Sequence, residues 1–254
     1  MRLSLLGYNL PNEMLSLRAL PWTEANSKTL RLDLNADQSM HDRSSFASLA
    51  DVADATLSYQ AYVPAKQADD DDGELLFKHT FSQKTLLAGS SKLVVHVSAE
   101  TQNDLDVYVQ LRKADAGGTI LQHVNVPLAD LGVGSAADVP AVNTLKYLGP
   151  TGQLRASMRA VAPELSARYW QTLSHDKAQV QPVQRGEVVR LEVFIWPTGI
   201  VFDAGESLVL KIAGHDMALA EFEHLKGAFP VVNEGKHLVH FGKRRENYLE
   251  LFVL

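Results

Sequence analysis

The sequence predicts an all-β fold, a two-layer β-sandwich. Stretches in which apolar residues occupy alternate positions recur at intervals of roughly 8 to 15 residues, the spacing of strands joined by turns. Convincing amphipathic helices are few, and the sequence lacks the regular alternation of strands and helices that marks parallel sheets. A chain of 254 residues is long enough for one large sandwich.

The clearest alternation lies along 191–196 and along 208–213. In both stretches apolar Leu, Val and Ile recur at every second position, the pattern of a strand with one face in a core. Pro197 follows the first stretch and has no backbone N–H to donate to a sheet. We therefore expect the chain to turn there, to form a short apolar strand over 200–202, and to reverse again at 203–206.

Similar patterns predict further strands at 2–6, 30–34, 75–81, 86–98, 104–112, 120–126, 154–159, 236–241 and 248–254. Residues 35–55 are polar and weakly periodic, so we expect a loop there, with or without a short helix. Gly89 to Ser91 is typical of a turn that enters a strand. The four aspartates of 69–72 repel one another, which favours a solvated loop over a calcium site.

Composition and charge exclude several classes of function. The net charge of −6 argues against a nucleic-acid surface, which needs clustered basic residues to displace counterions. The chain has no cysteine, which excludes disulfides, thiolate metal sites and cysteine nucleophiles. No apolar run approaches the roughly 20 residues that cross a membrane as a helix. The compartment stays open, with the cytoplasm slightly favoured.

Residue patterns that could carry chemistry are weak. The Gly-x-Ser-x-Gly elbow of α/β-hydrolases does not occur, and Ser157 has no evident base near it in the sequence. His237 and His240 lie three apart in a predicted strand, so their side chains point to opposite faces and cannot share a metal ion. His215 and His175 each precede an aspartate and are expected at the surface or in turns. We therefore expect no catalytic, cofactor-binding or metal-ligating residue, and no cofactor.

The three tryptophans, Trp22, Trp170 and Trp196, support two interpretations. Exposed indoles can stack on sugars, and large aromatics can also form an apolar patch on which another domain docks. Because aromatic residues are more often found in cores and interfaces, the docking patch is the favoured interpretation.

Several motifs resemble the C-terminal β-sandwich of the X-Pro dipeptidyl-peptidase and cocaine-esterase-type hydrolases. The most specific is Trp196-Pro-Thr198 followed by Phe202, Ala204-Gly205 and the alternating strand at 208–212. Similar pieces occur in the family's order at 77–81, 85–89, 92–97, Asp104-Leu-Asp-Val-Tyr-Val-Gln-Leu111, Leu154-Arg-Ala-Ser-Met-Arg159, 185–189, His240, Gly242 and 248–254. One departure is Met158, which stands where the family has a histidine.

The resemblance implies a jelly-roll sandwich of the galactose-binding-like type over 41–254. A linker and N-terminal strand extension over 1–40 would precede it, within one structural unit. The family's Ser, Asp and His belong to an α/β-hydrolase domain that these 254 residues do not contain. We therefore expect an inactive, non-catalytic domain that packs on such a catalytic domain, in the same parent chain or a separate one, and helps shape its substrate cleft.

Two further expectations remain open. The alternative function is a free-standing carbohydrate-binding jelly roll. A homo-oligomer is an additional option for the assembly, whereas nucleic acid and membrane are not expected as partners.

Overall fold

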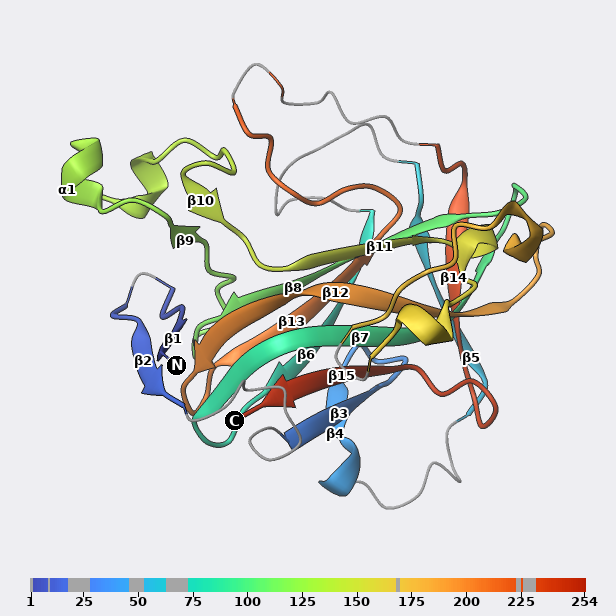
Figure 1. Cartoon of the computed structure of the whole chain (residues 1–254), viewed down its shortest axis with the longest axis horizontal. Coiled ribbons are helices and arrows are strands. Elements are labelled where there is room, and N and C mark those ends of the chain that lie inside the picture. The colour runs from blue at the N-terminus through green and yellow to red at the C-terminus, as the bar shows by residue number, and fades with distance from the viewer. Residues whose placement is uncertain are drawn as a thin grey trace.

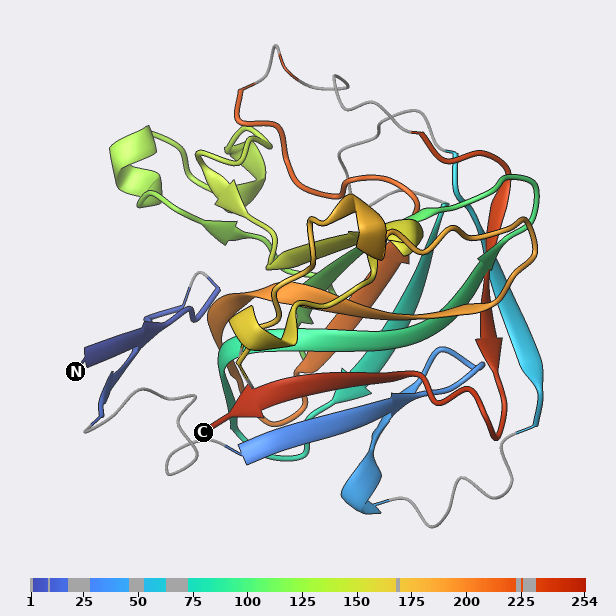
Figure 2. The same cartoon turned by 45° about the vertical axis from the view of Figure 1, so that its right-hand side comes forward.

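The computed structural model describes residues 2–8, 10–17, 28–45, 53–62, 73–167, 170–222, 225 and 232–254. Two antiparallel sheets form the body of the molecule, with loops and a small lobe at its margins (Figures 1 and 2). The predicted all-β sandwich is confirmed. The galactose-binding-like subtype stays a prediction.

The larger sheet is organised around one long strand, β7 (Thr85–Ala99). One edge of β7 pairs with β12 (Val189–Phe202), and the other edge pairs first with β15 and then with β14. The remaining strands of this sheet are β4 (Met40–Asp42), β3 (Lys28–Leu34), β15 (Tyr248–Val253), β14 (Lys236–Phe241) and β5 (Ala55–Gln60).

The smaller sheet has four strands in the order β11, β8, β13 and β6. Their bounds are β11 (Thr151–Arg155), β8 (Asp106–Ala114), β13 (Ser207–Ala213) and β6 (Glu74–Thr80). Apolar side chains from both sheets meet in one buried cluster, which confirms the core-facing rows predicted along 191–196 and 208–213.

Smaller elements lie outside the sandwich. A hairpin pairs β1 (Arg2–Leu5) with β2 (Glu13–Ser16), and a lobe contains β9 (His123–Val124), α1 (Leu128–Leu131) and β10 (Lys146–Tyr147). The 3-10 turns are Arg43–Ser45, Ala136–Asp138, Ala156–Met158, Pro163–Leu165 and Lys177–Gln179. The lobe projects beside β1 and β2 at one end of the molecule (Figure 1).

β12 is one continuous strand where the sequence predicted two. Its pairing with β7 shifts register between Ile195 and Thr198, which marks a bulge. Pro197 lies within this bulge, outside the ladder, so its missing N–H leaves no sheet hydrogen bond unmade. The turn predicted at Pro197 is therefore wrong, whereas the later reversal is confirmed by the hydrogen bond of 3.1 Å from the Glu206 N–H to the Asp203 carbonyl.

β7 also runs through a predicted turn. Gly89 has a φ of +135° within the strand, and an added Cβ would lie 3.3 Å from Cβ of Phe252. Ser91 pairs with both Ile195 and Leu251. The turn predicted at Gly89 to Ser91 is wrong because ladders on both edges of β7 outweigh the local turn preference.

β13 is buried on both faces, although its alternation predicted a single core face. Lys211 on the second face forms an ion pair of 2.8 Å with Glu74, and both side chains are only 2% exposed. On the neighbouring β8, buried Lys113 forms an ion pair of 2.7 Å with Glu206. Charges removed from water need such partners, because an unpaired buried charge costs several kcal/mol.

The remaining differences concern short strands and element ends. The strand predicted over 154–159 ends at Arg155, and a 3-10 turn follows. Of the strand predicted over 120–126, only His123 and Val124 form one. β2, β4, β5 and β10 were not predicted, since short strands depend on partners distant in sequence. Trp22 and the aspartates of 69–72 lie outside the described residues.

The proposed division at residue 40 stays a prediction. β3 pairs along its whole length with β15 and also pairs with β4, which favours treating 1–40 and 41–254 as one structural unit. Among the described residues no helix is long and apolar enough to cross a membrane.

The two sheets approach closely on one side, where β11 lies against β12. At Gly152 an added Cβ would overlap the carbonyl oxygen of Phe194. Only glycine permits this approach without moving one backbone away from the other.

We expect Gly152→Ala to lower the free energy of unfolding by about 2 kcal/mol or more, because the new methyl group overlaps a backbone atom. Urea unfolding followed by fluorescence measures this. Gly134→Ala is the matched control, since nothing lies within 4 Å of its added Cβ, and it should shift the free energy by less than about 0.5 kcal/mol. Equal effects of the two substitutions would contradict the close approach.

A second prediction concerns His237, which is buried between the sheets with Nδ1 3.0 Å from the Tyr59 hydroxyl. Burial lowers the pKa of His237 to about 4 from its ordinary 6.5. The folded state thus favours neutral His237. The stability that this preference contributes is fully present above pH 6.5 and is lost as the pH falls toward 4. The lowering of the pKa corresponds to about 3 kcal/mol of unfolding free energy.

Denaturant unfolding of the wild type and of His237→Gln at several pH values between 4 and 8 tests this. The wild type should lose more free energy of unfolding than the variant as the pH falls below 6.5. Parallel pH profiles would show that His237 does not carry the effect.

Candidate functional site

Three aromatic side chains form a cluster on the outer surface of the larger sheet. Alternation along β12 buries Val193 and Ile195 and turns Phe194 and Trp196 outward. Trp170 contacts both, with ring centroids 5.0 Å from Phe194 and 5.8 Å from Trp196. Trp196 is 62% exposed and Trp170 is 39% exposed. We call Trp170, Phe194 and Trp196 the aromatic face.

Hydrogen bonds join two described stretches, 160–167 and 170–174, and Trp170 begins the second of them. Ser166 Oγ donates to the Ala162 carbonyl at 2.8 Å and accepts from the Thr172 N–H at 2.9 Å. The Ala162 N–H in turn donates to the Thr172 carbonyl at 2.9 Å. These bonds hold Thr172, two residues after Trp170, against Ala162 and Ser166.

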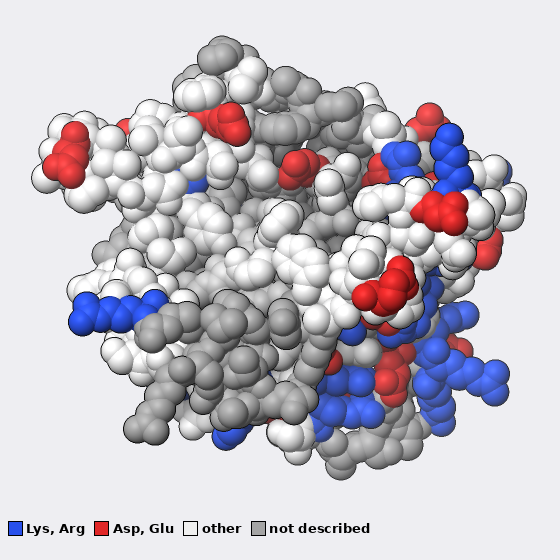
Figure 3. All heavy atoms as spheres, in the orientation of Figure 1, with Lys and Arg blue, Asp and Glu red and all other residues white. Residues whose placement is uncertain are grey.

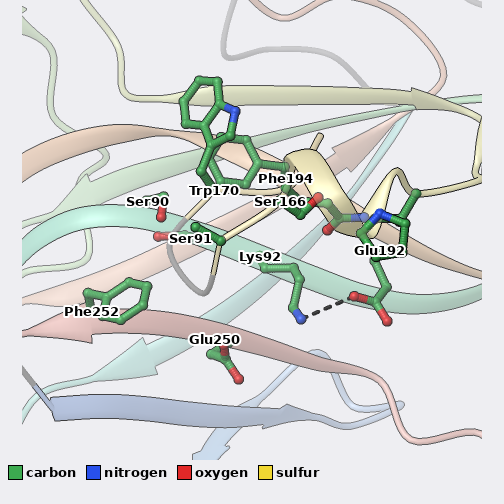
Figure 4. Close-up of a pocket in the computed structure, with 13 residues that line it drawn as sticks. Ser90, Ser91, Lys92, Ser166, Trp170, Glu192, Phe194, Glu250 and Phe252 are labelled. Carbon is green, nitrogen blue, oxygen red and sulfur yellow. Dashed lines mark ion pairs between the residues drawn. The ribbon is translucent and has the colours of Figure 1, made fainter. Parts of the chain in front are cut away.

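A groove of about 520 Å³ lies between these two stretches, 160–167 and 170–174, and the outer face of β7, β12 and β15. Figure 4 shows Trp170 and Phe194 on one side of it, with Lys92, Glu250 and Phe252 below. The Lys92 ammonium forms an ion pair of 3.1 Å with Glu192. Sequence patterns missed this groove because its residues come from three strands and a loop, and only their outward positions connect them.

Charged side chains are unevenly distributed on this side of the molecule. Figure 3 shows that they gather at the right of the view, whereas the middle, where Figure 1 places β11 and β12, carries few. A surface with exposed tryptophans and few charges is typical of a contact with another protein.

Two of the three tryptophans that were candidates for a docking patch lie together in the structure. Trp170 and Trp196 come together, and Trp22 lies outside the described residues. The two rings meet at 73°, so they do not form one flat surface. Stacking on a sugar uses a flat aromatic face, and this arrangement offers each ring separately.

The Asp104 and Arg155 motifs meet in the structure. Arg155 and Asp106 are paired residues of β11 and β8, and they form two hydrogen bonds of 2.7 Å. Ser157 donates its hydroxyl to Asp104 at 2.5 Å and its backbone N–H to the same carboxylate at 2.8 Å. These contacts join the loop before β8 to the turn after β11, which is a structural role.

Met158 is the last residue of this turn and lines a neighbouring hollow with Tyr108 and Leu173. The polar role that the family's histidine could have at this position is therefore not available to the side chain present here.

His237 and His240 point to opposite faces of β14, as expected. His237 faces the core beside Tyr59, while His240 Nε2 lies 2.9 Å from Ser98 Oγ. His175 is exposed. His215 is only 2% exposed, so of its two expected positions the surface one is wrong, whereas the turn agrees with the bend in which it lies. It follows the doubly buried β13, and burial extends into the bend. Within the described ranges no three His, Asp or Glu side chains gather to hold a metal ion. The predicted lack of catalytic, cofactor-binding and metal-ligating residues stays a prediction.

We expect Ser157→Ala to lower the free energy of unfolding by about 1 to 2 kcal/mol, because the partly buried Asp104 carboxylate loses a donor. Ser58→Ala, at an exposed position of β5, is the control and should change little. A serine-directed fluorophosphonate should label neither the wild type nor either variant. Stoichiometric labelling that disappears in Ser157→Ala would contradict the structural role.

Comparison with known proteins places the fold. The chain matches the family model described as the X-Pro dipeptidyl-peptidase C-terminal non-catalytic domain over residues 11–250. The resemblance read from the sequence motifs is therefore confirmed. No curated protein matches the chain.

Solved structures with the same fold are longer hydrolases. Two crystal structures of SACOL2612, a CocE/NonD family hydrolase from Staphylococcus aureus, superpose with TM-scores of 0.77 and 0.78 at 20% identity. They cover 100% of this chain, which spans 41% of theirs. At such identity the likeness shows the fold alone.

Two more distant structures agree. An aminopeptidase from the marine sediment archaeon Thaumarchaeota archaeon has a TM-score of 0.58 and 11% identity, covering 95% of this chain and 39% of its own. An alpha-amino acid ester hydrolase has a TM-score of 0.55 and 12% identity, covering 96% and 39%. With a family model that matches nearly the whole chain, this protein belongs to the X-Pro dipeptidyl-peptidase C-terminal non-catalytic domains.

Proposed function

We propose that this domain packs through its aromatic face on an α/β-hydrolase catalytic domain and forms one wall of that domain's substrate cleft. The hydrolases with the same fold have chains of which this domain spans 41% or 39%, which leaves room for a catalytic domain in those proteins. Sandwich domains without catalytic groups commonly act by contact with a neighbour.

The observation that carries the proposal is the exposure of Trp196. Its indole is 62% exposed on β12, a strand paired with β7 along its length, and it is backed by Trp170. Burying such a side chain at an interface contributes strongly to binding, and a rigid backbone lowers the entropy lost on docking. The larger sheet thus presents a preformed anchor.

The rival function is carbohydrate binding. Exposed Trp196 favours it, whereas the 73° angle between the two indoles does not offer the broad flat platform that sugars prefer. A glycan array separates the two functions. Selective binding that Trp196→Ala abolishes would favour the rival, and a blank array would favour docking.

We expect Trp196→Ala to weaken association with the hydrolase domain at least about tenfold, since a central aromatic anchor contributes about 2 kcal/mol or more. Titration calorimetry measures this, with the α/β-hydrolase domain that the proposal requires, expressed as a separate polypeptide, as the partner. Tyr62→Ala is the matched control, because Tyr62 is 52% exposed and follows β5, away from the aromatic face. Unchanged affinity in Trp196→Ala, or an equal loss in both variants, would contradict the proposed docking face.

A further inference from the structure

Trp196 lies in the bulge of β12, where the ladder with β7 is interrupted. The pairing stops at Ile195, resumes at Thr198, and leaves Trp196 and Pro197 between these two residues. A bulged residue is left out of the ladder, so its direction depends on the residues at both ends of the bulge. Pro197 restricts the backbone further, because its ring fixes φ at about −65°. The direction of the Trp196 indole therefore depends on what fixes Ile195 and Thr198.

The two ends of the bulge are fixed in different ways. Ile195 is fully buried and belongs to the core. Thr198 is held by its side chain as well as by the ladder, since its Oγ1 lies 3.0 Å from the hydroxyl oxygen of Tyr147, on β10 of the lobe. Burial raises the pKa of Tyr147 above its ordinary 10. The phenol therefore keeps its proton near neutral pH, and the two hydroxyls share a hydrogen bond.

Tyr147 is itself firmly anchored. It pairs with His123 of β9 and packs against the main core. Tyr8, from the N-terminal extension, lies beside it with ring centroids 6.5 Å apart. The buried Tyr8 hydroxyl donates a hydrogen bond of 3.2 Å to the carbonyl of Leu148, the next residue along from Tyr147. The bulge is thus tied to two parts of the chain that are distant in sequence, the lobe and the N-terminal extension.

The contacts of the indole leave it room to move. Trp196 is 62% exposed, and the ring of Trp170 meets it at 73° with the centroids 5.8 Å apart. A hollow of about 140 Å³, to which Thr151 and Gln153 contribute, adjoins the indole. A side chain with so much uncovered surface follows any shift of the backbone that carries it. The shape of the bulge therefore decides where the indole points.

We propose that Tyr147 and Thr198 are positioning residues for Trp196, because the bond between their hydroxyls holds the bulge in the shape that presents the indole to the hydrolase domain. This inference rests on the proposed docking and names the residues that preorganise its anchor. Preorganisation matters because ordering one flexible side chain on binding lowers the affinity about two- to tenfold. The lobe thus acts on the aromatic face without belonging to it.

The first test needs no partner. Relaxation of the ¹⁵N-labelled chain gives the order parameter of the Trp196 indole N–H, and Trp196→Phe assigns the signal. We expect it to fall from about 0.85, the value of a rigid N–H, to below about 0.6 in Thr198→Val, which removes the hydroxyl and keeps the branched shape. Tyr147→Phe should have the same effect. Thr198→Ser keeps a hydroxyl and should retain the wild-type value.

Thr80→Val is the matched control. It removes a hydroxyl pair of the same kind, because Thr80 Oγ1 lies 2.9 Å from Ser207 Oγ between β6 and β13, and it leaves the bulge untouched. The order parameter of the Trp196 indole should stay at its wild-type value in this variant. Backbone amide spectra of all variants report whether the fold is intact.

The second test asks whether the bond acts on docking through the indole. Thr198→Val should weaken association with the hydrolase domain about two- to tenfold when Trp196 is present. In the Trp196→Ala background the same substitution should change the affinity little, because the group that the bond positions is gone.

An unchanged order parameter in Thr198→Val would overturn the proposal, as would an equal fall in Thr80→Val or in Thr198→Ser. An equal loss of affinity with and without Trp196 would also overturn it, since the bond would then affect docking by another route. The relaxation measurement does not depend on docking. A failure of the docking proposal, seen as unchanged affinity in Trp196→Ala, is therefore distinguishable from a failure of this inference.

Discussion

The pairing of β12 with β7 is the constraint on which the candidate site depends. It continues on both sides of a bulge that contains Trp196 and Pro197, so Phe194 stays paired with β7 and Trp196 follows it on the same strand. If the chain had turned at Pro197, the two outward aromatics would have had no common support. The same pairing brings Glu192 beside Lys92 and Phe194 beside the groove, so the geometry of this surface follows from one ladder.

The buried charges of the smaller sheet are paired. Lys211 and Glu74 are withdrawn from water together, and Lys113 is satisfied by Glu206 and by the Val201 carbonyl at 2.8 Å. Replacing such pairs by apolar residues is often neutral for stability, so their value lies in fixing geometry. The Lys113 contacts link β8 to the turn after β12, which connects the smaller sheet to the strand that carries the aromatic face.

Local patterns predicted what depends on local chemistry. Alternating Leu, Val and Ile residues identified the core rows of β12 and β13, because burial of one strand face requires that period. The reversal after Asp203 was equally visible, since Gly205 has a φ of +89°. The turns predicted at Pro197 and Gly89 were wrong for the opposite reason. Both residues favour turns in isolation, and both are held in strands by partners more than 90 residues away in the sequence.

The site was less accessible to sequence reasoning than the fold. The Trp-Pro-Thr motif pointed to Trp196, and the tryptophans were recognised as candidates for a docking patch. Trp170 belongs to no strand pattern, and its contact with Trp196 is a tertiary contact that the local sequence does not specify.

The outer face of the larger sheet therefore has two parts with different requirements. Around Asp33, the cations Arg31 and Arg43 are both paired, with Glu246 completing the network, so that part is electrostatically self-sufficient in water. Around Trp170, Phe194 and Trp196 the surface is aromatic and gains free energy when it is covered. Covering the network around Asp33 would instead remove paired charges from water, which gains little or costs free energy. The aromatic face is therefore the part of this surface that is more favourable to bury.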